Sequence, residues 1–131
     1  MSFQCTVVTP EQQVLDETVS QCILPAHDGQ VGIRTNRAPL LVKLGAGPLR
    51  VDVAGGQRRS FFVDGGVAQM KGNKLTILTD NATPVSEIDA DAAKAEFEEA
   101  SARVPADDAG KRERQRDIRR AQAKRRVATT R

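Results

Sequence analysis

The sequence predicts two structural parts: a sandwich or barrel of short antiparallel strands over residues 1–85, and a pair of helices over residues 86–131. Three observations lead to this prediction. In the first part, turn residues interrupt short apolar runs roughly every 8–12 residues, which is typical of all-β domains. Residues 90–103 consist mostly of Ala, Glu and other strong helix formers. Residues 111–127 contain neither Gly nor Pro.

Short segments of the first part have the patterns of strands. Residues 49–53 alternate apolar and charged side chains, as half-buried strands do. Gly72-Asn73 can adopt the positive φ of a two-residue turn, which predicts a hairpin between residues 67–70 and 75–78. The other segments with strand patterns are residues 3–8, 18–24 and 60–63.

The first predicted helix covers residues 89–103. Ser86 or Asp89 can cap its N-terminus, where acidic side chains also suit the helix dipole. Apolar side chains recur at steps of three and four, which places on one face Ala90, Ala93, Phe97, Ala100 and Val104. This narrow stripe of mostly small side chains suits close packing against a second helix.

The second predicted helix covers residues 111–127, after a loop at residues 106–110. Ile118 and Val127 are its only aliphatic side chains larger than Ala. Burial of one Ile contributes roughly 2–3 kcal/mol, which anchors a helix of this length weakly. We therefore expect the helix to detach easily from its own domain, or to be held by another protein. The alternative is a solvated, partly frayed basic tail.

The net charge of +3 conceals a steep gradient along the chain. By residue count, the charge is +1 over residues 1–85, −6 over residues 86–110 and +8 over residues 111–131. An acidic first helix can therefore neutralise a basic second helix when the two pack together. An acidic partner can do the same when they separate.

The composition argues against most catalytic and ligand-binding classes. The chain has one histidine and two cysteines, so a zinc site or a Ser-His-Asp triad has almost no candidate residues. His27 lies in a turn-forming stretch, and Cys5 and Cys22 are expected to be buried core thiols. Trp and Tyr are absent, which argues against stacking on nucleic acid bases. We expect a non-enzyme without cofactor or metal, and no membrane-spanning or secretory segment.

Seven short motifs occur in a characteristic order: VTPE at 8–11, LP at 24–25, DGQVGI at 28–33, APLL at 38–41, GPLR at 47–50, FVDGGVA at 62–68 and LTILTD at 75–80. Glu87-Ile88-Asp89 follows at the predicted start of the helices. Together these motifs resemble the epsilon subunit of bacterial and chloroplast F-type ATP synthases. The resemblance extends over nearly the whole chain.

The resemblance implies a β-sandwich of about ten short antiparallel strands followed by a C-terminal α-helical hairpin. It implies a non-catalytic subunit of the central stalk that binds the gamma subunit and the c-ring and couples rotation to ATP synthesis. The C-terminal helices would inhibit ATP hydrolysis through transient contact with the beta subunits. The complex would place the chain peripherally at the cytoplasmic face of the bacterial plasma membrane.

The resemblance also assigns candidate residues. The c-ring docking residues would be Asp28, Gln30, Ile33, Asn36 and Arg37. Asn36-Arg37 stands where the family commonly has Gly-His, and Gln30 stands where an acid is frequent, so the electrostatics of this region differ. The residues that contact the beta subunits would be Arg119, Arg120, Arg125 and Arg126.

A nucleotide site of some family members is degenerate in this chain. The corresponding residues are Ile88, Asp89, Ala92 and Ala93, and Ala92 replaces an arginine. Glu99 stands where a second arginine would be. Phosphate binding needs such cations, which argues against a nucleotide sensor. The alternative function is a nucleic-acid-binding module that uses the basic C-terminal tail, because phosphate contacts need only Lys and Arg.

Overall fold

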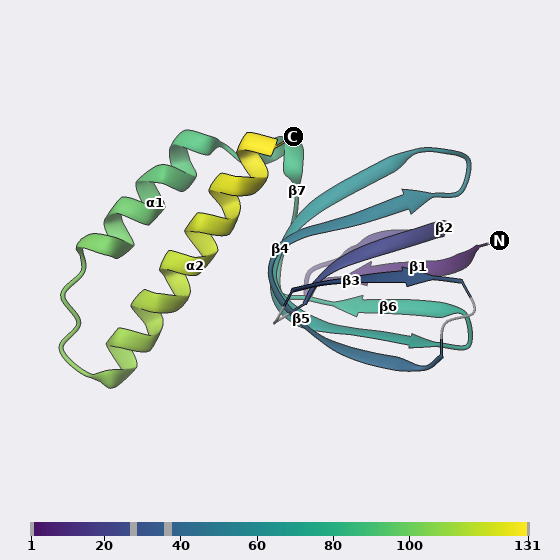
Figure 1. The fold of residues 1–131 in the computed structure, drawn as a ribbon, viewed down its shortest axis with the longest axis horizontal. Helices are drawn as coiled ribbons and strands as arrows, with labels where there is room; N and C mark the ends of the chain where they lie inside the picture. Colours follow the sequence, from purple (N-terminus) through teal and green to yellow (C-terminus); the bar gives the residue numbers. More distant parts are fainter. Residues whose placement is uncertain (1, 27–28, 36–37, 131) are drawn as a thin grey trace. The chain divides into compact units, whose positions relative to one another are not determined.

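The computed structural model describes residues 2–26, 29–35 and 38–130. The chain forms two compact units, Met1–Pro84 and Val85–Arg131 (Figure 1). Among the described residues, the first unit contains strands, and the second contains a short 3-10 helix followed by two α-helices.

The strands of the first unit form one sheet that closes on itself. Its order is β1-β6-β5-β4-β2-β3, and β7 pairs with β5. An additional pairing between β1 and β2 joins the two sides of the sheet (Figure 1). The strands in the described residues are β1 (Phe3–Val8), β2 (Gln13–Ala26), β3 (Gly29–Arg34), β4 (Leu40–Val53), β5 (Arg58–Lys71), β6 (Lys74–Leu78) and β7 (Ala82–Pro84).

This sheet confirms the predicted fold class, with two differences in detail. β2, β4 and β5 are each 14 residues long, because the chain continues as strand where turns were expected. The described residues therefore form seven strands, fewer than the about ten short strands that were expected. The other difference is that β1 and β6 are parallel, whereas only antiparallel pairs were predicted. Alternation patterns show which face a residue occupies but do not show which strand is its neighbour.

The core of the sandwich is apolar and closed. Alternate residues of β1 point inward, and Phe3, Cys5 and Val7 are buried. Cys5 and Cys22 are free and buried, as predicted. A hydrogen bond with Cys5 and burial both raise the pKa of the Cys22 thiol, which disfavours the reactive thiolate.

A bend in β5 depends on glycine. Gly65 and Gly66 have φ values of 83° and 122°, which disfavour residues with a side chain. A Cβ at Gly66 would lie 2.2 Å from the carbonyl oxygen of Leu78. The Thr79 hydroxyl donates a hydrogen bond of 2.8 Å to the carbonyl oxygen of Gly65. The bend therefore requires close contact between the backbones of β5 and the end of β6.

A polar cluster joins three strands on the surface of the sandwich. Asp52 on β4 pairs with Arg50 and with Arg58 on β5, each at 3.2 Å. The Gln21 side-chain amide on β2 donates to Asp52 at 2.5 Å. Hydrogen bonds from Arg50 and Gln21 stabilise the carboxylate and lower the pKa of Asp52 to about 2.

The hairpin between β5 and β6 has the predicted turn. Gly72 and Asn73 have φ values of 58° and 61°. This is the left-handed region that two-residue hairpins require, so the sequence prediction is confirmed at both positions.

The second unit begins with η1 (Val85–Glu87) and continues with α1 (Ala90–Ala102) and α2 (Asp108–Thr130). Asp89 caps α1, because its carboxylate accepts a hydrogen bond of 2.9 Å from the backbone N–H of Asp91. Val104 was predicted on the apolar stripe of the helix, but α1 ends before it and Val104 is 92% exposed. Pro105 disfavours helical geometry at the preceding residue, which accounts for this end.

α2 begins three residues earlier than the predicted start at residue 111. The carboxylate of Asp107 accepts a hydrogen bond of 2.7 Å from the backbone N–H of Gly110, and so caps the helix. Gly110 lies in the first turn of α2, whereas the sequence analysis placed it in a loop. The chain stays helical up to Thr130 and is not a frayed tail.

We predict that Gly66→Ala lowers the free energy of unfolding by about 2–4 kcal/mol, because the new Cβ clashes with backbone and φ becomes strained. Gly32→Ala is the matched control, since no atom lies within 4 Å of a Cβ at this position. It should change stability by less than about 0.5 kcal/mol. Urea unfolding of both variants measures the difference, and equal effects would contradict the role of the bend.

Candidate docking surfaces

The outer face of the sheet has a row of exposed apolar side chains. Val67 on β5 lies opposite Leu78 on β6, and Leu78 lies opposite Val8 on β1. Leu41 on β4 points to the same side as Lys43, which lies opposite Val67. Leu41, Leu78 and Val67 are 70%, 53% and 41% exposed, and Val8 is half-buried. Val8, Leu41, Val67 and Leu78 are called the apolar face below.

Val67, Leu78 and Val8 are successive cross-strand neighbours, whereas Leu41 lies diagonally from Val67, two residues from its partner Lys43. Side chains directly opposite each other on adjacent strands lie within contact distance. Single exposed apolar residues are common on protein surfaces, but contiguous ones mark interaction sites. This arrangement therefore indicates that another protein covers the face.

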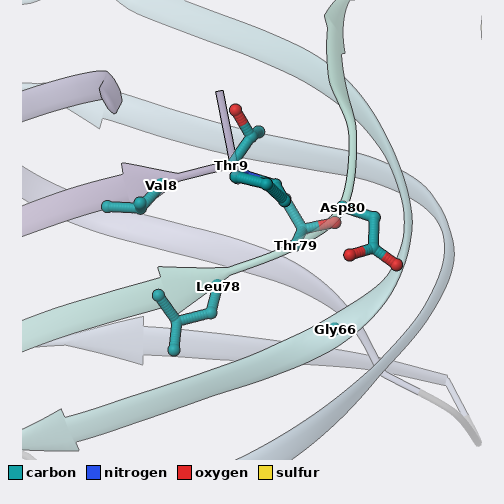
Figure 2. Close-up of a pocket in the computed structure, with 7 residues that line it drawn as sticks. Val8, Thr9, Gly66, Leu78, Thr79 and Asp80 are labelled. Atoms are coloured by element: carbon teal, nitrogen blue, oxygen red, sulfur yellow. The ribbon is translucent and has the colours of Figure 1, made fainter. Parts of the chain in front are cut away.

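Two shallow hollows border the apolar face. The first has a volume of about 290 Å³ and is lined by Val8, Thr9, Pro10, Gly66, Leu78, Thr79 and Asp80. Figure 2 shows Val8 and Leu78 on neighbouring strands at one side of it, with Asp80 beyond Thr79. The second, of about 280 Å³, is lined by Pro39, Leu40, Leu41, Gln69, Met70 and Lys71. Each hollow can accept an apolar side chain of a partner.

The structure describes two of the five predicted c-ring docking residues. Gln30 is exposed on β3, a strand at the end of the sheet order. Ile33 is 0% exposed and belongs to the sandwich core, so its side chain supports the strand and is not available to a partner at the surface. Asp28, Asn36 and Arg37 lie outside the described residues, as does His27.

α1 and α2 are joined by an ion cluster around Asp117. Arg103, at the end of α1, donates from Nε and Nη2 to both carboxylate oxygens of Glu99, at 2.9 and 2.6 Å. Its Nη1 donates to Oδ2 of Asp117 on α2 at 2.6 Å. Arg120 contacts Oδ1 of Asp117 at 3.0 Å. Glu99, Arg103, Asp117 and Arg120 are called the Asp117 cluster below.

Asp117 is the buried centre of this cluster. Its side chain is 10% exposed, whereas the side chain of Glu99 is 62% exposed. The hydrogen bond from Arg103 is the main cause that lowers the pKa of Asp117, and the charges of Arg120, Arg103 and Arg116 add to it. Arg103 lowers the pKa of Glu99 in the same way, and both carboxylates raise the pKa of Arg103. Both carboxylates therefore stay ionised at neutral pH.

Further contacts between the helices are mostly polar. Lys124 pairs with Glu96 at 3.3 Å, and the guanidinium of Arg125 lies 5.3 Å from the centre of the Phe97 ring. Nη2 of Arg114 donates to the carbonyl oxygen of Ser101 at 2.9 Å. The buried apolar side chains along the two helices are small: Ala93, Ala100, Ala121, Ala123, Val127 and Ala128.

The structure divides the four arginines that were predicted to contact the beta subunits. Arg120 pairs with Asp117, and Arg125 lies over Phe97, so both act within the closed hairpin. Arg119 and Arg126 are exposed on α2. Arg120 and Arg125 therefore make contacts that their position in a basic sequence did not show.

The degenerate nucleotide motif has structural roles here. Ile88 is buried, and Asp89 caps α1. Ala92 is exposed, Ala93 is buried against α2, and Glu99 binds Arg103. The guanidinium of Arg103 is therefore already paired with the carboxylate of Glu99. This pairing makes Arg103 unsuited to bind a phosphate group.

Sequence reasoning missed Asp117 and the apolar face. Asp117 is one of only two acids among the ten basic residues of residues 111–131, and Arg116 and Arg120 flank it at i−1 and i+3. This isolated acid was a usable signal for a pair with α1. Val67 and Leu78 were counted as strand residues, because a sequence pattern does not show which apolar residues remain exposed.

No group of three or more His, Cys, Asp or Glu side chains in the described part of the chain could hold a metal ion. No helix in the described ranges is long and apolar enough to cross a membrane.

Comparisons with known proteins agree with this two-part architecture. The family model for the β-sandwich domain of the ATP synthase delta/epsilon chain matches residues 2–85. The chain is 42% identical to the ATP synthase epsilon chain of Rhodopirellula baltica over 100 residues, which cover 76% of this chain and 77% of that one. It is 41% identical to the chloroplastic epsilon chain of Emiliania huxleyi over 98 residues, 75% of each chain.

A solved structure shows the same fold. A chain in the Euglena gracilis mitochondrial ATP synthase structure, which contains OSCP, F1 and the c-ring, superposes with a TM-score of 0.85 at 22% identity. The match covers 93% of this chain and 78% of that one.

A β-sandwich joined to a helical hairpin, with these relatives, defines a subunit of an ATP synthase. The chain belongs to the ATP synthase delta/epsilon chain family, and the curated relatives that match it are epsilon chains. The resemblance, fold class and stalk function predicted from the sequence are confirmed. As part of this complex, the chain is a peripheral component of a membrane-associated assembly.

Proposed function

We propose that the chain binds the gamma subunit through the apolar face and the c-ring through the end of the sandwich near Gln30. In this role it transmits rotation between the two and performs no chemistry. The complex operates at the cytoplasmic face of the bacterial plasma membrane. The observation that supports the proposal most strongly is the exposed apolar face on an otherwise closed sandwich.

The apolar face suits a permanent partner. Burial of a large aliphatic side chain contributes roughly 1.5–3 kcal/mol, so Leu41 and Leu78 together would supply a substantial part of the binding energy. Lys43, Lys71 and Lys74 lie exposed on the same strands. They would form a polar rim around an apolar centre, which is the usual arrangement of stable interfaces.

The end of the sandwich near Gln30 suits a different partner. β3 pairs with β2 and stands last in the sheet order, and Gln30 and Arg34 are exposed on it. Both side chains are polar, and Arg34 is charged. They fit hydrogen bonding to the polar rim of a ring better than burial in a hydrophobic interface.

The hairpin would act as a regulator of ATP hydrolysis. Its closed form brings the acidic α1 against the basic α2, for example in the partly exposed pair between Glu96 and Lys124. Exposed ion pairs contribute about 0–1 kcal/mol each, so an acidic partner can replace them at little cost. The extended helix would then contact the acidic surface of the beta subunits.

A nucleic-acid-binding role receives less support from the structure. Arg114, Arg120, Lys124 and Arg125 contact α1 or Asp117, which removes them from contact with phosphate. The curated relatives identified above are ATP synthase epsilon chains.

We predict that Leu41→Asp with Leu78→Asp releases the chain from the gamma subunit. Two buried charges at the interface should weaken binding more than a hundredfold, because each replaces an apolar contact with an unpaired carboxylate. Pull-down from detergent-solubilised membranes measures how much gamma subunit remains bound. Gln57→Asp, in the exposed turn between β4 and β5, is the control. Retention of gamma by a folded double variant would place that interface elsewhere.

We predict that a chain ending at Gly110 raises ATP hydrolysis by the assembled enzyme several-fold, because α2 can no longer reach the beta subunits. Reversal of the exposed Arg119 and Arg126 to Glu should give a similar increase. The assay compares hydrolysis rates of complexes with equal subunit content. An unchanged rate for the shortened chain would show that α2 is not an inhibitor in this protein.

A further inference from the structure

The contacts between α1 and α2 depend on one carboxylate. Asp117 is the buried acid of α2, and it contacts Arg103 from the end of α1 and Arg120 from its own helix. Arg103 is held in place by two hydrogen bonds from its guanidinium to Glu99. In this pair, the donor Arg103 is already oriented by Glu99, and the acceptor Asp117 is buried. The ion pair of Lys124 with Glu96 also joins the helices and is more exposed.

The remaining contacts hold the helices together weakly. Ala93, Ala100, Ala121 and Ala128 allow close approach but each buries only a methyl group. Nε of Arg114 is buried without a hydrogen-bond partner in the described residues, which opposes closure. Four cations of α2, at Arg114, Arg116, Arg120 and Lys124, also lie within about three helical turns and repel one another.

We propose that the Asp117 carboxylate is the latch of the hairpin, and that its pair with Arg103 sets the balance between the closed hairpin and an open form with both helices intact. Without this charge, Arg103, Arg116 and Arg120 are left close together with one carboxylate, Glu99, to neutralise them. The closed form then loses its main attraction between the helices and gains repulsion. The latch consists of protein side chains alone and needs no bound nucleotide.

The test measures the distance between α1 and α2 in the full chain. Spin labels on Ala95→Cys and Gln122→Cys, which are exposed on α1 and α2, report closure by pulsed electron resonance. The native Cys5 and Cys22 are buried and remain unlabelled. We expect one short distance for the labelled wild type at low salt. Asp117→Asn should raise the population of longer distances at least tenfold, and 1 M KCl should raise it in the wild type by screening.

Glu98→Gln is the matched control, because it removes the same charge from an exposed position of α1. It should leave the distances unchanged. Arg103→Gln should open the hairpin as Asp117→Asn does, and the double variant should open it no further, because the two residues share one interaction. Equal distances in Asp117→Asn and Glu98→Gln would overturn the proposal. Loss of helix in the circular dichroism spectrum of Asp117→Asn would also overturn it, since opening requires intact helices.

The regulatory use of the latch rests on the proposed function, whereas the distance measurement does not. In the assembled enzyme, Asp117→Asn should lower ATP hydrolysis several-fold, because more α2 is free to extend. A chain ending at Gly110 lacks both position 117 and most of α2, and should hydrolyse ATP faster than the Asp117→Asn variant. Opening of the isolated chain without a change in hydrolysis would contradict the inhibitory role and leave the latch intact.

Discussion

Nearly all the large buried apolar side chains of this chain lie in the sandwich, and the rest of the structure follows from that distribution. Leu24, Ile33, Leu49 and Ile77 belong to one core that the closed sheet encloses. In the second unit the buried side chains are mostly alanines, with Ile88, Val127 and the acid Asp117. The sandwich is therefore held by the hydrophobic effect, whereas the hairpin is held largely by charge.

Stabilisation by apolar burial suits a sandwich that binds a permanent partner, and stabilisation by ion pairs suits a hairpin that changes conformation. A rigid sheet can present the apolar face in a constant geometry, which a permanent interface requires. A hairpin closed by ion pairs has a small free-energy difference between its forms, because the pairs can be exchanged for similar pairs with a partner. Asp117 has a particular effect on the equilibrium between the closed and open hairpin, because this one buried carboxylate contacts several cations: Arg103, Arg116 and Arg120.

Much of the fold was predictable from the sequence because local patterns reflect local physics. The alternation in residues 3–8 and the Gly72-Asn73 turn depend on neighbouring residues only, and both predictions were correct. Ile33 was predicted as a docking residue from the resemblance, which supplied its position but did not show that its side chain is buried. The apolar face and the Asp117 cluster depend on which strands and helices are neighbours, so no local pattern shows them. Asp is a common helix N-cap, so the capping role of Asp107 could have been predicted. Gly110 led instead to the prediction of a loop at residues 106–110.

Hydrogen exchange of the full chain at 0.1 M and 1 M KCl tests the central claim most directly. The account predicts that the amides of β1 and β5 exchange slowest and at the same rate at both salt concentrations, because burial of apolar surface protects them. The amides of α2 from Arg114 to Ala128 should exchange faster, and at least tenfold faster again at 1 M KCl, where the screening length falls to about 3 Å. Exchange of α2 as slow as that of the strands, and independent of salt, would contradict the claim that charge holds the hairpin.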